Sequence, residues 1–214
     1  MKDGFVIAIV DYGMGNLRSI ENAIKHIGNY DVRVTNDPAD IERSDCIVIP
    51  GVGAFRDAMY NLESRGLVPI LSKQAFDEKK PILGICLGMQ LFFDSSEEGQ
   101  VTKGLGWIPG PVRYIDVKSP YRVPHVGWNN LQFRVPSRLL DNLGEDKNFY
   151  FVHSYHAVCD ERYITATVDH GIEVTASVQS GNIYGMQCHP EKSQQNGMIV
   201  LRNFLDMVGD GLDA

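Results

Sequence analysis

Cys86 is the residue of this chain best suited to act as a nucleophile. It follows an apolar run, residues 81–85, that predicts a short buried strand, and a helix is expected to open at Leu87. Gly84 and Gly88 bracket it in the spacing of a strand-to-helix elbow, whose sharp bend leaves little room for a Cβ on either side. The first turn of a helix favours an anion, so this position favours a thiolate. The alternative is a structural cysteine buried between two turn glycines.

A nucleophilic cysteine needs a histidine within reach and a third group that orients the ring. His189 fits this role because it ends the strand-like run 183–187 and Pro190 holds it in an extended conformation. The carboxylate of Glu191 is then expected to reach the imidazole, fix its tautomer and stabilise its positive charge. Cys188 is expected to face the core, because successive strand side chains point to opposite faces.

The other five histidines are less suited to serve Cys86. His26 lies near the end of a predicted helix, His170 beside a turn glycine and His125 in a proline-rich loop, so each is expected at the surface or in a cap. His153 and His156 are expected on opposite faces of a strand, which argues against a joint site.

The elements before Cys86 alternate between strand and helix. Buried or alternating runs predict strands at residues 5–10, 31–35 and 46–49, and helical patterns or turns cover residues 17–27, 38–43, 55–62 and 67–76. Such alternation predicts a doubly wound parallel sheet with helices on both faces. Strand-like runs that predict an antiparallel extension follow at residues 112–117, 131–135, 149–152, 164–167, 174–178 and 183–187. A last helix is expected over residues 198–208, with a frayed tail at 209–214.

Two glycine loops follow predicted strands. Gly51, Val52 and Gly53 lie at the carboxyl end of one strand, where ligands bind in such folds, and their backbone amides are candidates to stabilise an oxyanion. An ordinary strand-to-helix turn is the alternative there. The G-x-G at residues 13–15 invites a dinucleotide interpretation, but Arg18 stands where the third glycine belongs.

Composition restricts the possible functions. The 214 residues carry a net charge of -7, which argues against nucleic acid binding, and they are expected to form one domain. The four cysteines form no C-x-x-C pair, which fits a reducing cytoplasm. The apolar run 5–10 is too short to span a membrane. The set Cys188, His189 and Glu191 lacks a fourth ligand, so no metal site is expected, and no cofactor is expected.

Two distant motifs together resemble those of the triad-type, or class I, glutamine amidotransferases: G-I-C-L-G-M-Q at residues 84–90 and H-P-E at 189–191. Within that family, the chain is similar to the glutaminase subunits of imidazole glycerol phosphate synthase. The segments that carry this second resemblance are D-Y-G-M-G-N-L-R-S at 11–19, P-G-V-G-A-F at 50–55, P-H-V-G-W-N at 124–129, F-Y-F-V-H-S-Y at 149–155 and H-P-E-K-S at 189–193. The resemblance covers nearly the whole chain. It implies a single glutamine amidotransferase type 1 domain over residues 1–214 with a three-layer, flavodoxin-like sheet.

The resemblance also implies an activity and a partner. Glutamine would be hydrolysed to glutamate, and the ammonia would pass to a separate (βα)8-barrel cyclase subunit, as a heterodimer, in histidine biosynthesis. Because free ammonia is mostly protonated and would escape, such coupling needs a sealed route between two active sites. Another class I glutaminase, such as an anthranilate-type subunit, and a non-catalytic flavodoxin-like module are the alternatives.

Site residues are expected as follows. Cys86, His189 and Glu191 are the catalytic candidates, and Leu87, with Val52 and Gly53, would stabilise the oxyanion. The resemblance assigns the substrate to Gly51, Gln90, Glu98, Ser154 and Tyr155. Trp128, Tyr150 and Lys192 are the candidates for the contact with the partner. The family commonly has an aromatic residue before the catalytic histidine, where this chain has Cys188, and we expect this to alter packing rather than activity.

Overall fold

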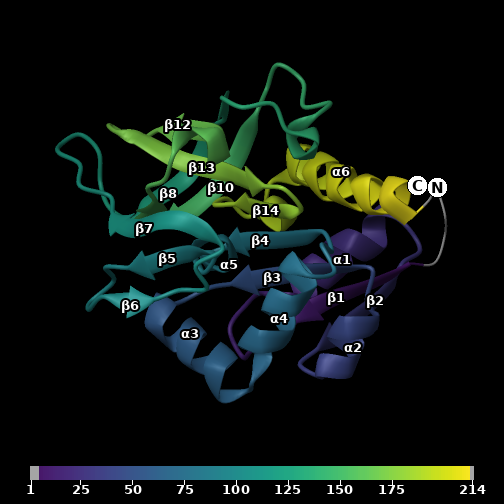
Figure 1. The fold of residues 1–214 in the computed structure, drawn as a ribbon. Coiled ribbons are helices and arrows are strands. Elements are labelled where there is room, and N and C mark those ends of the chain that lie inside the picture. Colours follow the sequence, from purple (N-terminus) through teal and green to yellow (C-terminus); the bar gives the residue numbers. More distant parts are fainter. Residues whose placement is uncertain (1–4, 213–214) are drawn as a thin grey trace.

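The computed structural model describes residues 5–212, and its centre is an eight-stranded sheet in the order β2-β1-β3-β4-β14-β13-β12-β9 (Figure 1). Five neighbouring strands are parallel: β1 (Val6–Val10), β2 (Asp31–Thr35), β3 (Cys46–Gly51), β4 (Ile82–Cys86) and β14 (Ile183–Met186). Three strands continue the sheet in antiparallel pairs: β13 (Glu173–Ser180), β12 (Ile164–Asp169) and β9 (Gln132–Phe133). The predicted parallel core with an antiparallel extension is confirmed.

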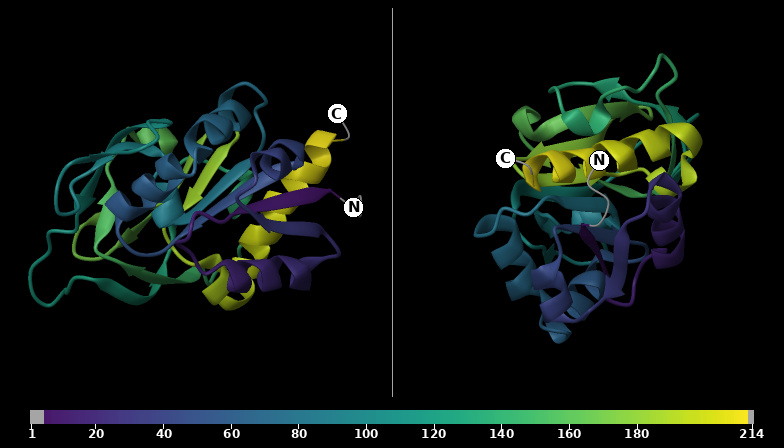
Figure 2. Two further views of the ribbon diagram at one scale, coloured as in Figure 1. Left: turned by 90° about the horizontal axis from the view of Figure 1, so that it is seen from below. Right: turned by 90° about the vertical axis from the view of Figure 1, so that its right-hand side faces the viewer.

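Helices cover both faces of the sheet, which gives the three layers expected of a doubly wound fold. One face carries α1 (Leu17–Ile27) and α6 (Gln194–Leu212), which lie side by side in Figure 2. The other face carries α2 (Pro38–Arg43), α3 (Phe55–Ser64) and α4 (Leu67–Phe76). Each face of the sheet packs against its helices through an apolar core of its own. The prediction of a frayed tail at residues 209–214 is wrong for residues 209–212, which continue α6. Residues 213–214 lie outside the described range.

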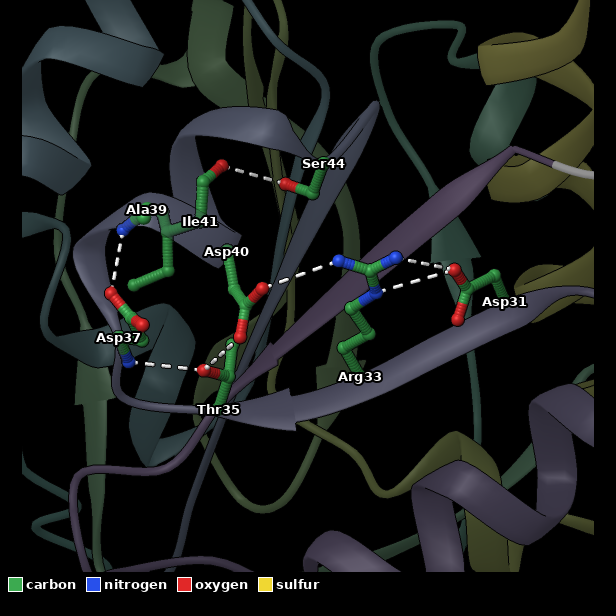
Figure 3. A network of polar contacts seen from close by, with 8 residues as sticks. All are labelled: Asp31, Arg33, Thr35, Asp37, Ala39, Asp40, Ile41 and Ser44. Atoms are coloured by element: carbon green, nitrogen blue, oxygen red, sulfur yellow. Dashed lines mark hydrogen bonds and ion pairs between the residues drawn. The ribbon is translucent and has the colours of Figure 1, made fainter.

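The connection from β2 to α2 is closed by a polar network (Figure 3). The side chain of Asp37 caps α2 by accepting a hydrogen bond from its backbone. Arg33 donates to Asp31 at 2.8 Å and to Asp40 at 3.2 Å, and the hydroxyl of Thr35 donates to Asp40 at 3.1 Å. These contacts explain how so short a helix is held at the carboxyl end of β2.

Two small sheets stand beside the main one. The first has the order β11-β7-β5-β6 and the second pairs β10 with β8. Their bounds are β5 (Phe93–Ser96), β6 (Thr102–Lys103), β7 (Ile108–Tyr114), β8 (His125–Asn130), β10 (Asn148–His153) and β11 (Tyr155–Ala157). Three short 3-10 helices complete the described chain: η1 (Arg138–Leu140), η2 (Glu161–Tyr163) and η3 (Pro190–Lys192). We did not predict β5, β6, β8 or β11 from the sequence. β6 and β11 are only two and three residues long, β5 pairs irregularly with β7, and β8 pairs with the distant β10.

The helix after Cys86 is much shorter than a typical helix. α5 covers only Leu87–Gln90, and the chain then enters β5. Four residues carry little of the aligned peptide dipole that a longer helix would supply. Electrostatic support for an anion at this position therefore comes from nearby N–H groups and side chains rather than from a long helix dipole. Among residues 5–212, no helix combines the length and the apolar character that crossing a bilayer requires.

Candidate active site

Cys86 lies at the end of β4, between the carboxyl ends of β3 and β14. Its backbone has φ 54° and ψ -112°, a conformation that non-glycine residues rarely adopt and that often marks a functional site. Both flanking glycines allow neighbouring atoms to approach the backbone on either side of Cys86 closely. A Cβ on Gly84 would lie 2.5 Å from the ring of Phe92, and one on Gly88 would lie 1.8 Å from the carbonyl oxygen of Ile49. The bend around Cys86 therefore has the geometry of a nucleophile elbow.

His189 comes to the same edge of the sheet from the end of β14. Its backbone N–H donates to the carbonyl oxygen of Tyr150 at 3.0 Å, and its own carbonyl accepts from the hydroxyl of Ser193 at 2.6 Å. The first contact attaches the loop after β14 to β10, and the second closes the loop on itself. The imidazole Nδ1 lies 2.9 Å from Oε1 of Glu191, and both side chains are buried, with 2% and 0% exposed. Glu191 thereby fixes the orientation of the ring.

The charges around His189 favour its protonated form. Burial alone lowers the pKa of the imidazole, but Cys86 and Glu191 more than offset this and raise it to about 9. The second ring nitrogen, Nε2, has no hydrogen-bond partner among residues 5–212. Cys86 is nevertheless close enough to the ring to be a main cause of the rise in the pKa of His189. The three side chains thus form a buried row of sulfur, imidazole and carboxylate.

A cavity of about 280 Å³ opens in front of this row, which is the size of a small polar metabolite. It is lined by Val52, Gly53, Cys86, Leu87, Gln90, Glu98, Val152, His153, Ser154, Tyr155 and His189. Of the expected substrate residues, only Gly51 is not part of this lining. It pairs with Cys86 across β3 and β4 and is buried. Glu191 lies behind His189 and does not line the cavity.

The amide of Gln90 is already used within the protein. Its Nε2 donates to the carbonyl oxygen of Tyr155 and to Oε1 of Gln187, both at 2.9 Å. Gln187 in turn places its own Nε2 3.7 Å from the sulfur of Cys86. Only the carbonyl oxygen of Gln90 thus remains for a ligand. Gln187 was missed from the sequence, although strand alternation put it on the same face as His189.

Glu98 lies at the cavity from the loop after β5. Its Oε2 accepts a hydrogen bond from the backbone N–H of Phe55 at 2.7 Å, at the start of α3. Its other oxygen is free of that contact and can meet a cationic ligand group. The neighbour Glu97 is exposed and pairs instead with Arg113 at 3.4 Å, outside the cavity. The structure therefore separates these two adjacent carboxylates.

A chain of neutral histidines supports the opposite wall. Nδ1 of His153 lies 2.9 Å from the carbonyl oxygen of Tyr155 and must donate to it, so Nε2 of His153 accepts from Nδ1 of His125 at 3.1 Å. Burial lowers the pKa of His125 to about 4 and that of His153 to about 3. The expectation that His125 is a surface or capping residue is wrong: it is 3% exposed and stacks on Phe151.

The three interface candidates form one cluster on β8, β10 and η3. Trp128 and Tyr150 face each other across β8 and β10 with ring centroids 6.0 Å apart, and Nζ of Lys192 lies 5.9 Å from the ring of Tyr150. Trp128 is 45% exposed. A larger, open groove of about 740 Å³ is lined in part by Trp128 and contains none of the catalytic candidates.

Cys188 and Cys46 are fully buried, as strand alternation and the apolar strand pattern predicted. Within residues 5–212, no group of three or more His, Cys, Asp or Glu residues is arranged to hold a metal ion.

Known proteins match nearly the whole chain, and they point to one family. Residues 8–208 match the family described as glutamine amidotransferase class-I. Imidazole glycerol phosphate synthase subunit HisH 2 of Vibrio vulnificus is 57% identical over 202 residues, 94% of each chain. Subunit HisH 2 of Methanococcus maripaludis is 47% identical over 94% of this chain and 98% of its own.

Solved structures share the fold at low identity. The crystal structure of a glutamine amidotransferase superposes with a TM-score of 0.72 at 16% identity, over 95% of this chain and 98% of that one. A chain of PurLQS from Thermotoga maritima superposes with a TM-score of 0.70 at 19% identity, over 95% and 98%. The fold is thus common to the class, whereas the high identities are to one kind of subunit. The chain belongs to the class I glutamine amidotransferases and, among them, to the HisH subunits of imidazole glycerol phosphate synthase.

Proposed function

We propose that this chain hydrolyses glutamine to glutamate and ammonia. The observation that carries the proposal is the row formed by Cys86, His189 and Glu191 at the wall of a cavity sized for a small metabolite. The high identity to HisH subunits supports glutamine as the substrate. No cofactor is required, because the chemistry is acyl transfer to a thiol followed by hydrolysis.

The first half-reaction forms a thioester. The sulfur of Cys86 attacks the side-chain carbonyl carbon of glutamine, and the carbonyl oxygen becomes an oxyanion. The N–H of Leu87 and one from Val52 or Gly53 stabilise that charge. Protonated His189 gives its proton to the leaving nitrogen, so ammonia departs and the acyl group remains on sulfur.

The second half-reaction restores the enzyme. His189, now neutral, takes a proton from water, and the resulting hydroxide attacks the thioester carbonyl. The carbon–sulfur bond breaks, the thiolate of Cys86 returns and glutamate leaves. Throughout the cycle Glu191 holds Nδ1 of the ring and stabilises each imidazolium that forms.

Polar groups across the cavity suit the amino-acid end of glutamine. The carboxylate of Glu98 can pair with the α-ammonium group, and the carbonyl oxygen of Gln90 can accept from it. Ser154 and Tyr155 also line the cavity, and we assign the α-carboxylate to them.

We further propose that the ammonia passes to a (βα)8-barrel cyclase subunit in a heterodimer that acts in histidine biosynthesis. The cluster of Trp128, Tyr150 and Lys192 is our candidate contact, because Trp128 is an exposed aromatic residue and such residues are typical anchors of an interface. There the ammonia would help form imidazole glycerol phosphate and an aminoimidazole carboxamide ribotide. The four free cysteines fit a cytoplasmic location.

The test is a glutaminase assay with and without a cyclase subunit that holds its ribonucleotide substrate. We expect low activity for the chain alone and a marked rise with the loaded partner, on the hypothesis that the partner reorients a peptide of the 50–53 segment toward the oxyanion. Absence of glutamine hydrolysis in both conditions would contradict the proposed function. Activation by an anthranilate-type synthase in place of the cyclase would assign the chain to another class I pathway.

A further inference from the structure

Tyr12 is a buried side chain that the proposed chemistry does not use. It follows β1 in the D-Y-G-M-G-N turn, and none of its surface is exposed. Its hydroxyl donates a hydrogen bond of 2.6 Å to the carbonyl oxygen of Pro50, which lies 38 positions away at the end of β3. Pro50 begins the segment that contributes Val52 and Gly53 to the cavity lining. The bond therefore joins the first glycine turn of the chain to the proposed oxyanion segment.

Close packing makes this contact rigid. A Cβ on Gly51 would lie 2.5 Å from the hydroxyl oxygen of Tyr12 and 2.8 Å from the backbone nitrogen of Gly88. Gly88 itself is in contact with the end of β3, because a Cβ there would meet the backbone of Ile49 and Pro50. Tyr12, the end of β3 and the nucleophile elbow are thus packed closely against one another.

The hydroxyl of Tyr12 is held in its donor form. Burial raises its pKa well above the ordinary value, and the nearby Cys86 raises it further. A phenol that stays protonated keeps its hydrogen bond to Pro50 whether Cys86 is a thiol or a thiolate. The contact is therefore independent of the state of the nucleophile during the reaction.

The far end of the same segment has an anchor of its own. The N–H of Phe55 donates to Glu98 at 2.7 Å, so residues 51–54 lie between two side-chain attachments. Between them Gly53 has φ 99°, and Val52 is 41% exposed. Any rotation of a peptide that aims an N–H at the oxyanion is confined to this interval. Fixed ends allow a local rotation without displacement of β3 or α3.

We propose that Tyr12 is a positioning residue for the oxyanion-stabilising segment. By holding the carbonyl of Pro50, it sets the plane from which the Val52 and Gly53 amides project toward the substrate carbonyl above Cys86. The inference rests on the proposed glutaminase function. It assigns Tyr12 a role in the transition state, where the oxyanion exists, and none in the binding of glutamine.

The variant Tyr12→Phe tests this role, because it removes the hydroxyl and keeps the ring that fills the core. It is assayed in the complex with the cyclase subunit. We expect kcat for glutamine hydrolysis to fall about 10-fold, less than the 10²–10³ typical of losing an oxyanion donor outright, with KM unchanged within about 2-fold. Alkylation of Cys86 by iodoacetamide should keep its rate, because that displacement forms no oxyanion. Ammonia-dependent synthesis by the complex should also be unchanged.

Tyr60→Phe is the matched control, since Tyr60 lies on α3 and is 68% exposed. It should leave kcat, KM and alkylation at wild-type values. A Tyr12→Phe complex with kcat within about 2-fold of wild type would overturn the inference and leave the glutaminase function intact. A parallel loss of kcat, alkylation rate and thermal stability would also overturn it, because it would indicate general structural damage. A wild-type complex without glutaminase activity would overturn the proposed function itself and, with it, the inference.

Discussion

His189 and Glu191 are joined side chain to side chain over only two positions of the chain, with Nδ1 2.9 Å from Oε1 and 2% and 0% of the two side chains exposed. The other oxygen of Glu191 has no hydrogen-bond partner among residues 5–212. A buried carboxylate with so few partners is stable only beside a positive charge. The pair therefore favours the imidazolium, in agreement with the rise in the pKa of His189 to about 9.

The first prediction concerns Glu191→Gln. An amide at this position removes one of the groups that raise the pKa of His189, so the imidazolium should lose its proton at a lower pH. We expect kcat to fall by about 10²–10⁴ and the alkaline limb of the pH profile of kcat/KM to move to lower pH. Steady-state assays from about pH 6 to about pH 10 measure both. An alkaline limb that stays in its wild-type position would contradict the assigned role of Glu191.

The second prediction separates the two buried cysteines next to His189. Cys86→Ala should abolish glutamine hydrolysis while ammonia-dependent synthesis by the complex persists, because the partner's reaction needs only ammonia. Cys188→Ser is the control and should keep most of the activity, since Cys188 is fully buried in the core. Paired assays with glutamine and with ammonium salt distinguish the cases. A Cys86→Ala complex that loses both activities would contradict the role of nucleophile.

The fold and the catalytic candidates were predictable because their signals are local. Continuous apolar runs and helical spacing identified the parallel strands and helices, and two short motifs identified Cys86 and His189. The strand β8 was missed, because Gly127 and two asparagines weaken its pattern and its pairing with β10 is what forms it. Tyr12 and His125 were missed for a related reason. Each lies in a segment rich in turn residues, and a hydrogen bond to a residue 28 or more positions away helps to hold it in the interior.

The third prediction tests the carboxylate of Glu98. Glu98→Gln should raise KM for glutamine about 10-fold, because the charge that pairs with the α-ammonium is lost. It should also lower the free energy of unfolding by about 0.5–1 kcal/mol, since the anion at the start of α3 becomes neutral. Glu97→Gln is the matched control, because Glu97 is exposed and lies outside the cavity. Equal KM values for the two variants would contradict the assignment of Glu98.

The fourth prediction tests the aromatic cluster as the contact with the cyclase subunit. Trp128 is 45% exposed and packs edge-on against Tyr150, the geometry of an anchor whose remaining surface a partner would bury. Truncation of such an anchor costs about 2 kcal/mol or more, so Trp128→Ala should weaken the heterodimer about 30-fold or more in a calorimetric titration. Tyr60→Ala, which removes a more exposed aromatic residue from α3, should leave the affinity at its wild-type value. Because the two variants lose similar exposed aromatic surface, equal affinities would mean that the partner binds elsewhere. A selective loss for Trp128→Ala would instead indicate that the partner buries the cluster of Trp128, Tyr150 and Lys192.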